Sequence, residues 1–134
     1  MIDAFTAKHL EHVSTRTFEE VVPAFEAATG SVEDGYIGKA AGAAKSRADF
    51  ETNIRAREGT SGFMRFLIVD HGAWLARVGV NAKARMYTIG NPLIAQTMIR
   101  HDLGAGLNVP IRLMIYEDAS GKVRLAYVTC RHRS

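Results

Sequence analysis

The sequence predicts an α+β domain with two layers, in which helices pack on one face of an antiparallel sheet. Short apolar segments with strand-like composition follow one another through short connections, and helix-start signals precede segments whose apolar residues recur every three to four positions. The 134 residues are 47% hydrophobic and 23% charged, which is typical of a globular protein with a single core. We therefore treat residues 1–134 as one domain.

The first part of the chain predicts a short strand at Leu10–Val13 and then an amphipathic helix. Thr17 and Glu20 have the spacing of a capping box, in which each side chain binds a free amide of the first turn. The apolar stripe of this helix consists of Phe18, Val21, Val22 and Phe25. Pro23 conflicts with a regular helix because it lacks an amide hydrogen, so we expect a later start or a bend. Gly30 suits a left-handed helix exit.

The next segment is rich in glycine, and we expect a loop over Ser31–Ala44. Ser46 and Asp49 then form a second capping signal, and Phe50 and Ile54 lie one helical turn apart. This pattern predicts a short helix that ends by Gly59.

The middle of the chain predicts an antiparallel meander, because connections this short allow hairpins rather than crossovers. Its expected strands are Phe63–Val69, Trp74–Val80 and Ala84–Ile89, with a turn at Asp70, His71 and Gly72 between the first two. Asn91 and Pro92 then predict the start of a helix that ends near Gly104 and Gly106.

The last two strands, Ile111–Tyr116 and Val123–Val128, form a hairpin across Asp118, Ser120 and Gly121.

Three stretches in the last third of the chain resemble the bacterial Domain-of-Unknown-Function 302 family: Tyr87-Thr-Ile-Gly90-Asn91-Pro92-Leu-Ile-Ala95, Val109-Pro110-Ile-Arg-Leu and Tyr116-Glu-Asp-Ala-Ser-Gly121. The helix that starts at Phe18 and the Asp70-His71-Gly72 turn are also similar to longer members. The resemblance implies a two-layer α+β fold that commonly pairs as a dimer, and it implies no established activity. It also implies a further helix after the last strand, where this sequence ends, so we expect a second copy or a swapped element to cover the sheet; a shortened chain is the alternative.

Composition and charge exclude several classes of protein. The net charge of +3 comes from basic residues spread along the chain, with the densest cluster at Arg131, His132 and Arg133, so we expect no nucleic-acid partner. No apolar run reaches the roughly 20 residues that cross a bilayer, and no leader pattern opens the sequence, which predicts a cytoplasmic protein without a membrane partner. Cys130 is the single cysteine and has no intrachain partner.

The candidate site residues are Asn91, His71, Asp70 and Tyr87. Asn91 brings a side-chain amide to the free amides of a helix start, a geometry that binds anions, although the same residue type is a common helix cap. Asp70 can orient the imidazole of His71 at a turn, although a polar turn explains both residues equally well. Tyr87 belongs to the same motif as Asn91.

No metal site is expected. His9 and His12 are three residues apart on a strand and point to opposite faces. Arg131, His132 and Arg133 could activate the Cys130 thiol, but an unreactive thiol is the simpler interpretation. The sequence contains no nucleophile elbow and no phosphate-binding loop.

Three functions stay open. The first is a non-catalytic dimeric module that binds a small, partly apolar or anionic ligand between sheet and helix, with haem on His71 or His101 as one version. The second is an enzyme in which His71 and Asp70 act with Asn91 as an oxyanion donor. The third is a structural or protein-interaction domain that uses the open face of its sheet.

Overall fold

The computed structural model describes residues 2, 4 and 6–130, without the side chain of Cys130. Its strands are β1 Ala7–Ser14, β2 Gly30–Ser31, β3 Met64–Asp70, β4 Ala84–Gly90, β5 Ile111–Glu117 and β6 Val123–Cys130. Its helices are α1 Phe18–Ala28, α2 Tyr36–Ala43, α3 Arg47–Arg55, α4 His71–Arg77, α5 Pro92–Ile99 and the 3-10 helix η1 Leu103–Asn108. The basic cluster at 131–133 lies outside the described residues.

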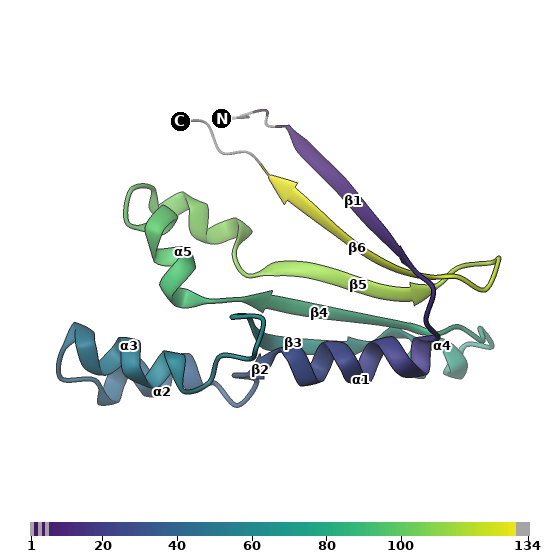
Figure 1. Ribbon diagram of the computed structural model, residues 1–134. Helices are drawn as coiled ribbons and strands as arrows, with labels where there is room; N and C mark the ends of the chain where they lie inside the picture. Colours follow the sequence, from purple (N-terminus) through teal and green to yellow (C-terminus); the bar gives the residue numbers. More distant parts are fainter. Residues whose placement is uncertain (1, 3, 5, 131–134) are drawn as a thin grey trace.

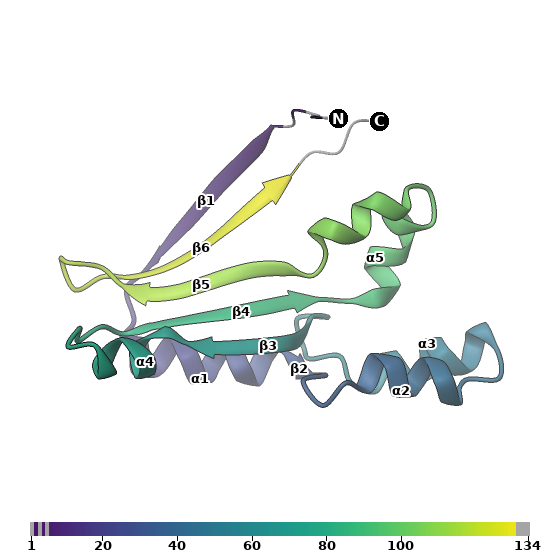
Figure 2. The ribbon, with the colours of Figure 1, turned by 180° about the vertical axis from the view of Figure 1, so that it is seen from behind.

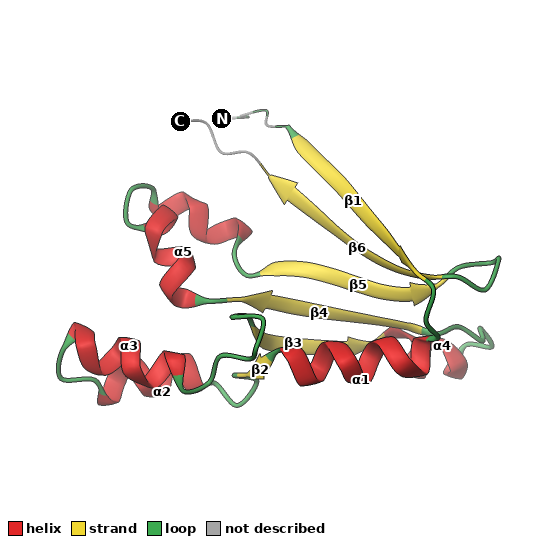
Figure 3. Cartoon of the chain, viewed as in Figure 1, coloured by secondary structure: helices red, strands yellow, loops and turns green. Residues whose placement is uncertain are grey.

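The strands form one sheet in the order β1-β6-β5-β4-β3-β2. All neighbours pair antiparallel except the two-residue β2, which runs parallel to β3. Helix α1 lies along the sheet, whereas α2 and α3 extend past one end of it and α5 rises at that same end (Figures 1 and 2). Coloured by element, the chain shows the mixture of helix and strand that the sequence predicts (Figure 3). The expected α+β class is confirmed.

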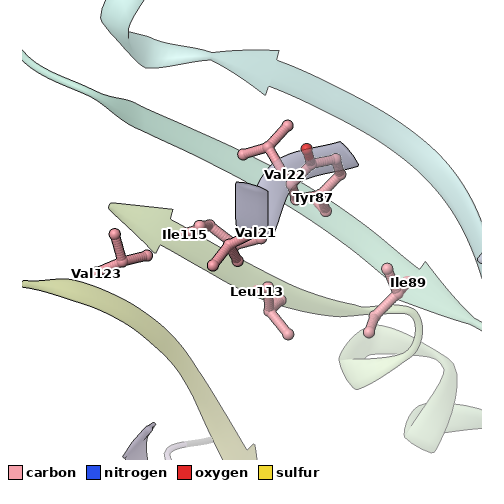
Figure 4. Packing of buried hydrophobic residues seen from close by; sticks show 7 residues of the cluster. All are labelled: Val21, Val22, Tyr87, Ile89, Leu113, Ile115 and Val123. Atoms are coloured by element: carbon pink, nitrogen blue, oxygen red, sulfur yellow. The ribbon is translucent and has the colours of Figure 1, made fainter. Parts of the chain in front are cut away.

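The main core lies between α1 and the sheet (Figure 4). Val21 and Val22 of α1 are buried against residues from three central strands, namely Tyr87, Ile89, Leu113, Ile115 and Val123. Burial of each large apolar side chain contributes roughly 1.5–3 kcal/mol. A second cluster, made by Val32, Ala40, Ile54 and Met64, attaches α2 and α3 to the end of β3.

Helix α1 begins where its capping box places it. The hydroxyl of Thr17 accepts from the amide of Glu20, and the carboxylate of Glu20 accepts from the amide of Thr17. The expected later start is wrong, because α1 continues through Pro23 from Phe18. Pro23 removes one hydrogen bond, to the carbonyl of Glu19, and the capping box and two buried valines offset that loss.

Gly30 is needed for close packing and not for a left-handed exit. Helix α1 ends at Ala28, with Thr29 in extended conformation, and Gly30 has no positive φ. A Cβ atom at Gly30 would lie 1.6 Å from the carbonyl oxygen of Arg57. The expectation of a left-handed residue here is therefore wrong.

The loop expected over the glycine-rich segment Ser31–Ala44 is wrong. This segment contains the end of β2 and the helix α2. Ala40 is buried, and the hydroxyl of Tyr36 donates to the carbonyl of Asn53 at the end of α3. Packing against α3 thus outweighs the helix-weakening effect of Gly38 and Gly42. The expected α3 is confirmed, with Ser46 accepting from the amide of Asp49.

The meander prediction fails between β3 and β4. Residues Asp70 to Gly72 do not form a hairpin turn, and Trp74–Val80 is not a strand, because α4 occupies His71–Arg77. Asp70 caps this helix by accepting from the amide of Ala73 at 3.0 Å. Gly79, with a φ of 83°, permits the left-handed conformation that ends a helix. Strands β3 and β4 remain antiparallel neighbours.

The last third of the chain follows the sequence prediction more closely. Asn91 caps α5, Pro92 is its first residue, and β5 and β6 form the expected hairpin. Helix α5 ends at Ile99, earlier than expected, because Asp102 starts the 3-10 helix η1 that contains Gly104 and Gly106.

Candidate functional site

Asn91 joins β4, α5 and the loop before β3. Its Oδ1 accepts from the amide of Leu93 at 2.9 Å, and its Nδ2 donates to Oε1 of Glu58 and to the carbonyl of Gly62, both at 2.8 Å. The residue is 6% exposed. Both donor hydrogens of an Asn amide are thereby used, so the side chain holds the fold together and has no donor left for a ligand.

Asp70 and His71 are also engaged within the protein. Asp70 caps α4, and its carboxylate lies 4.0 Å from a guanidinium nitrogen of Arg85. Nδ1 of His71 accepts from Nε1 of Trp74 at 2.9 Å, with the two rings edge to face. Asp70 therefore supports the helix start, and it is not bonded to the imidazole.

The structure places Asp70 and Asn91 at opposite ends of the β3–β4 pair. Met64 pairs with Gly90 at one end of this pair, and Asp70 pairs with Arg85 at the other. Six residues of extended chain span about 20 Å. The enzyme hypothesis required His71, Asp70 and Asn91 in one pocket, and that convergence does not occur.

Tyr87 belongs to the main core. It is fully buried, and its ring lies 4.7 Å from that of Phe25 on α1. Burial and the nearby carboxylate of Glu26 raise the pKa of Tyr87 to about 12. Its hydroxyl has no hydrogen-bond partner within the described part of the chain, so this residue contributes to packing beneath α1.

Two apolar hollows lie near α5 instead. The first, which we call the α5 groove, has a volume of about 310 Å³ and is lined by α5, Phe63, Phe66 and the segment from Ile89 to Pro92. The second, the β5–β6 hollow, has a volume of about 490 Å³. The two share Met98 and the segment Val109–Ile111 as a common wall. Asn91 lines only the α5 groove.

The β5–β6 hollow lies where two neighbouring strands separate. Pairing of β5 with β6 ends at Leu113 and Tyr127, although β6 continues to Cys130 in register with β1. Both ribbon views show β6 diverging from β5 toward this end (Figures 1 and 2). Residues 128–130 thus have β1 on one side and no β5 partner on the other.

Three methionines line the β5–β6 hollow. Met86 and Met114 are direct cross-strand partners, and Met98 approaches from α5. Because side chains alternate along a strand, Met86 and Met114 point away from the core that contains Tyr87 and Leu113. Thioether side chains are flexible and polarisable, and they adapt to aromatic and irregular ligands.

We call the face of the sheet that points away from α1 and the main core the open face. Away from the hollow, charged side chains on the open face pair with one another. Arg124 bonds to Asp118 at 2.7 Å and to Glu11 at 3.2 Å, and the hydroxyl of Tyr116 donates to Glu11 at 2.7 Å. Hydrogen bonding from Tyr116, and then from His9, holds the pKa of the Glu11 carboxyl below its usual value. On the open face, the paired charged groups therefore lie toward the hairpin between β5 and β6, and the apolar hollow lies toward the opposite end of these strands.

Sequence reasoning missed the β5–β6 hollow. Met86 and Met114 are next in sequence to the core residues Tyr87 and Leu113. Because side chains alternate along a strand, the sequence could have shown that both methionines point away from the core. The sequence does not show where β6 leaves β5. His9 lines the hollow, whereas neither His71 nor His101 does. The described residues contain no cluster of three or more His, Cys, Asp or Glu side chains able to hold a metal.

Comparison with known proteins agrees with this fold. The model of the family described as Domain of unknown function DUF302 matches residues 41–132. The chain belongs to the DUF302 family. A crystal structure of an uncharacterised conserved DUF302 protein from Bacillus stearothermophilus superposes with a TM-score of 0.56 at 12% identity, covering 89% of this chain and 71% of that one. At this identity the likeness is one of fold.

Curated relatives of this DUF302 chain include proteins named fluoride-specific ion channel FluC 1. Those from Brucella suis biovar 1 (strain 1330) and Brucella abortus biovar 1 (strain 9-941) are 31% identical over 93 residues, which is 65% of this chain. The aligned segment covers 37% and 34% of those proteins, so the match involves about a third of their length. None of the helices in the described part of this chain has the length and apolarity that a bilayer crossing requires.

Proposed function

We propose that this DUF302 chain is a non-catalytic module that binds a small, partly apolar ligand in the β5–β6 hollow and works as a homodimer. The observation that carries the proposal is the hollow itself, which opens where β6 leaves β5 and is walled by Met86, Met98 and Met114. Its volume of about 490 Å³ falls in the range of small-molecule sites, which are mostly apolar with a few polar groups.

A binding role fits the residues of the hollow better than a catalytic one. Among its described lining residues, His9, Arg112 and Tyr127 carry ionisable side chains, and the rest of the wall is aliphatic, thioether or neutral polar. General acid–base and nucleophilic mechanisms require positioned pairs of groups. His9 contacts Glu11 at 3.3 Å, and Glu11 does not line the hollow.

The two histidines expected to bind haem, His71 and His101, do not line the proposed ligand site. His71 accepts a hydrogen bond from Trp74 on α4, and His101 follows α5 at its outer end; neither lines the β5–β6 hollow or the α5 groove. The histidine at the rim is His9. Fluoride transport forms no part of the proposal, because the chain corresponds to about a third of the channel proteins that it matches.

The dimer part of the proposal is supported by an exposed apolar surface around α5. Ile94 and Met98, one helical turn apart, are 51% and 43% exposed, and Leu107 of η1 is 90% exposed. Ionisable residues between Pro92 and Pro110 are confined to positions 100–102. Interface centres are depleted of charge, and contiguous apolar patches mark contact sites.

Ligand binding is tested by fluorescence titration with the apolar dye 8-anilinonaphthalene-1-sulfonate. Ala126 is a buried, small residue of the hollow's wall, so Ala126→Leu should fill the space and weaken dye binding at least fivefold. Ala76→Leu, on the exposed surface of α4, is the matched control and should bind like the wild type. Equal binding by all three proteins, with equal thermal stability, would overturn the hollow as the site.

Dimerisation is tested by sedimentation velocity across a hundredfold range of concentration. Ile94→Asp should shift the protein toward monomer, and Val78→Asp, an exposed apolar residue of the α4 end, should not. A wild-type protein that sediments as a monomer throughout would overturn the dimer and leave the ligand site to be judged on its own titration.

A further inference from the structure

The β5–β6 hollow is lined by a cationic side chain that no other group in the described part of the chain neutralises. Arg112 lines the hollow and is exposed to solvent. It lies two residues before Met114 on β5, so both side chains point to the same face of the sheet. Within the described part of the chain, Arg112 has no ion pair or hydrogen-bond partner for its side chain. An unpaired guanidinium therefore stands at the edge of an apolar cavity.

The other arginine of this face is satisfied. Arg124 binds both Asp118 and Glu11, and Glu11 also accepts from Tyr116. Glu11 lies opposite Ala126 of the hollow's wall, and its carboxylate is thereby committed to Arg124, Tyr116 and His9. Arg112 is left as the cation that a bound anion can approach, because none of the described residues that line the hollow carries a carboxylate.

We propose that the ligand of the β5–β6 hollow is an amphipathic monocarboxylate whose carboxylate pairs with Arg112 and whose apolar body lies against Met86, Met98 and Met114. This inference rests on the proposed function and specifies the chemical class of its ligand. A guanidinium can hold a carboxylate through two parallel hydrogen bonds. The methionine side chains offer an adaptable apolar surface, which suits a flexible alkyl chain or an aromatic ring equally.

The separation of the strands contributes to the same site. Beyond Tyr127, β6 has no β5 partner, so Val128 and Thr129 present a free strand edge beside Arg112. Both residues line the hollow. A carboxylate at Arg112 would thus lie at the mouth, next to backbone polar groups, while the alkyl or aromatic part extends toward the apolar wall made by Leu107 and Met98.

The test compares two ligands of equal chain length by isothermal titration calorimetry, decanoate and the neutral 1-decanol, both below their aggregation limits. Wild-type protein should bind decanoate at least tenfold more tightly than decanol. Arg112→Gln should abolish that preference while decanol binding stays within twofold. Arg112→Lys should restore part of it, because a lysine keeps the charge without the planar fork. Arg77→Gln, an exposed arginine of α4, is the control and should behave like the wild type.

The outcomes separate this inference from the proposed function. Equal affinity of the wild type for decanoate and decanol would overturn the carboxylate and leave the apolar site standing. A preference for decanoate that persists in Arg112→Gln would overturn Arg112 as the partner. Failure of the wild type to bind either ligand, together with failure to bind the dye, would overturn the proposed function as well.

Discussion

The side-chain amide of Asn91 donates a hydrogen bond to Oε1 of Glu58, 2.8 Å away. The two residues belong to segments 33 positions apart, so this bond links the start of α5 to the loop that follows α3. A second bond from the same amide to the carbonyl of Gly62, and the capping bond from Leu93, complete the connection. Asn91 thus ties α5 to the loop before Phe63, and both of these segments line the α5 groove.

We expect Asn91→Ala to lower the free energy of unfolding by about 2–3 kcal/mol, because it removes a helix cap and leaves two partly buried acceptors without their donor. Urea unfolding measures the change. Asn81→Ala, at an exposed position outside helix and strand, is the matched control and should cost less than about 0.5 kcal/mol. A cost for Asn91→Ala no larger than that of the control would contradict the role assigned to the amide.

Asn91→Asp separates the contribution of the helix cap, in which Asn91 accepts from Leu93, from that of the two hydrogen bonds that Asn91 donates to Glu58 and Gly62. Aspartate keeps an acceptor for the amide of Leu93 but offers no hydrogen to Glu58 or Gly62, and it places a second carboxylate beside Glu58. We therefore expect it to destabilise at neutral pH about as much as Asn91→Ala does, despite the intact cap. Unfolding midpoints in urea at pH 7 test this; stability equal to the wild type would show that the cap alone matters.

The side chain of Arg65, on β3, donates hydrogen bonds to the C-terminal end of α1. Its Nη1 donates to the carbonyl of Thr29 at 2.8 Å, to the hydroxyl of the same residue at 2.6 Å, and to the carbonyl of Glu26. Arg65→Met should destabilise the fold by about 2–3 kcal/mol, because the last carbonyls of α1 lose their donor in a mostly buried place. Arg55→Met on the exposed side of α3 is the control, and equal urea midpoints for the two variants would refute the prediction.

Local signals predicted the elements that depend on a few neighbouring residues. The capping box of Thr17 and Glu20 placed the start of α1 to the residue, and Asn91-Pro92 did the same for α5. These signals work because the bonds involved join residues two to four positions apart. Helix α4 had such a signal too, with Asp70 as its cap and Gly79 just after its end, but Trp74 and Leu75, together with Val78 and Val80 beyond the helix, suggested a strand.

Features that depend on distant contacts were not predictable in the same way. Helix α2 forms because Ala40 packs against α3, and a sequence pattern of alanines and glycines does not reveal that partner. Likewise, the β5–β6 hollow depends on the point at which strand pairing stops, between Tyr127 and Val128. The sequence indicated Asn91 as a site residue because its amide stands at a helix start, and Tyr87 because it belongs to the same motif, whereas the structure gives both of them roles in the fold.

Gly30, just after α1, and Gly42, inside α2, differ in how closely other atoms pack around their backbone. A Cβ atom at Gly30 would lie 1.6 Å from the carbonyl oxygen of Arg57, whereas one at Gly42 would meet no atom within 4 Å. Gly30→Ala should destabilise by more than about 3 kcal/mol or prevent folding, since a backbone clash of that size has no relaxed solution. Gly42→Ala, inside α2, should stabilise by about 0.5–1 kcal/mol. Differential scanning calorimetry should give melting temperatures on opposite sides of the wild type.

The buried hydroxyl of Tyr87 predicts a loss of stability at alkaline pH. Its pKa is about 12 in the folded protein, raised by burial first and by Glu26 second, against about 10 in an unfolded chain. Below pH 10 both states keep the proton and the hydroxyl adds no pH dependence. Between pH 10 and 12 the unfolded chain ionises first, so folding becomes less favourable, by about 1.4 kcal/mol at pH 11.

Tyr87→Phe should remove that part of the alkaline decline. At pH 7 the variant should match the wild type within about 1 kcal/mol, because the hydroxyl has no hydrogen-bond partner among the described residues. Urea unfolding at pH 8 and pH 11 gives the change for each protein, and the wild type should lose about 1.4 kcal/mol more than Tyr87→Phe between the two. Tyr127→Phe controls for removal of a partly exposed phenol and should keep the contribution of Tyr87. If the wild type and Tyr87→Phe decline equally, the phenol of Tyr87 already ionises in the folded protein as it does in water, and its environment is wetter than its burial beneath α1 implies.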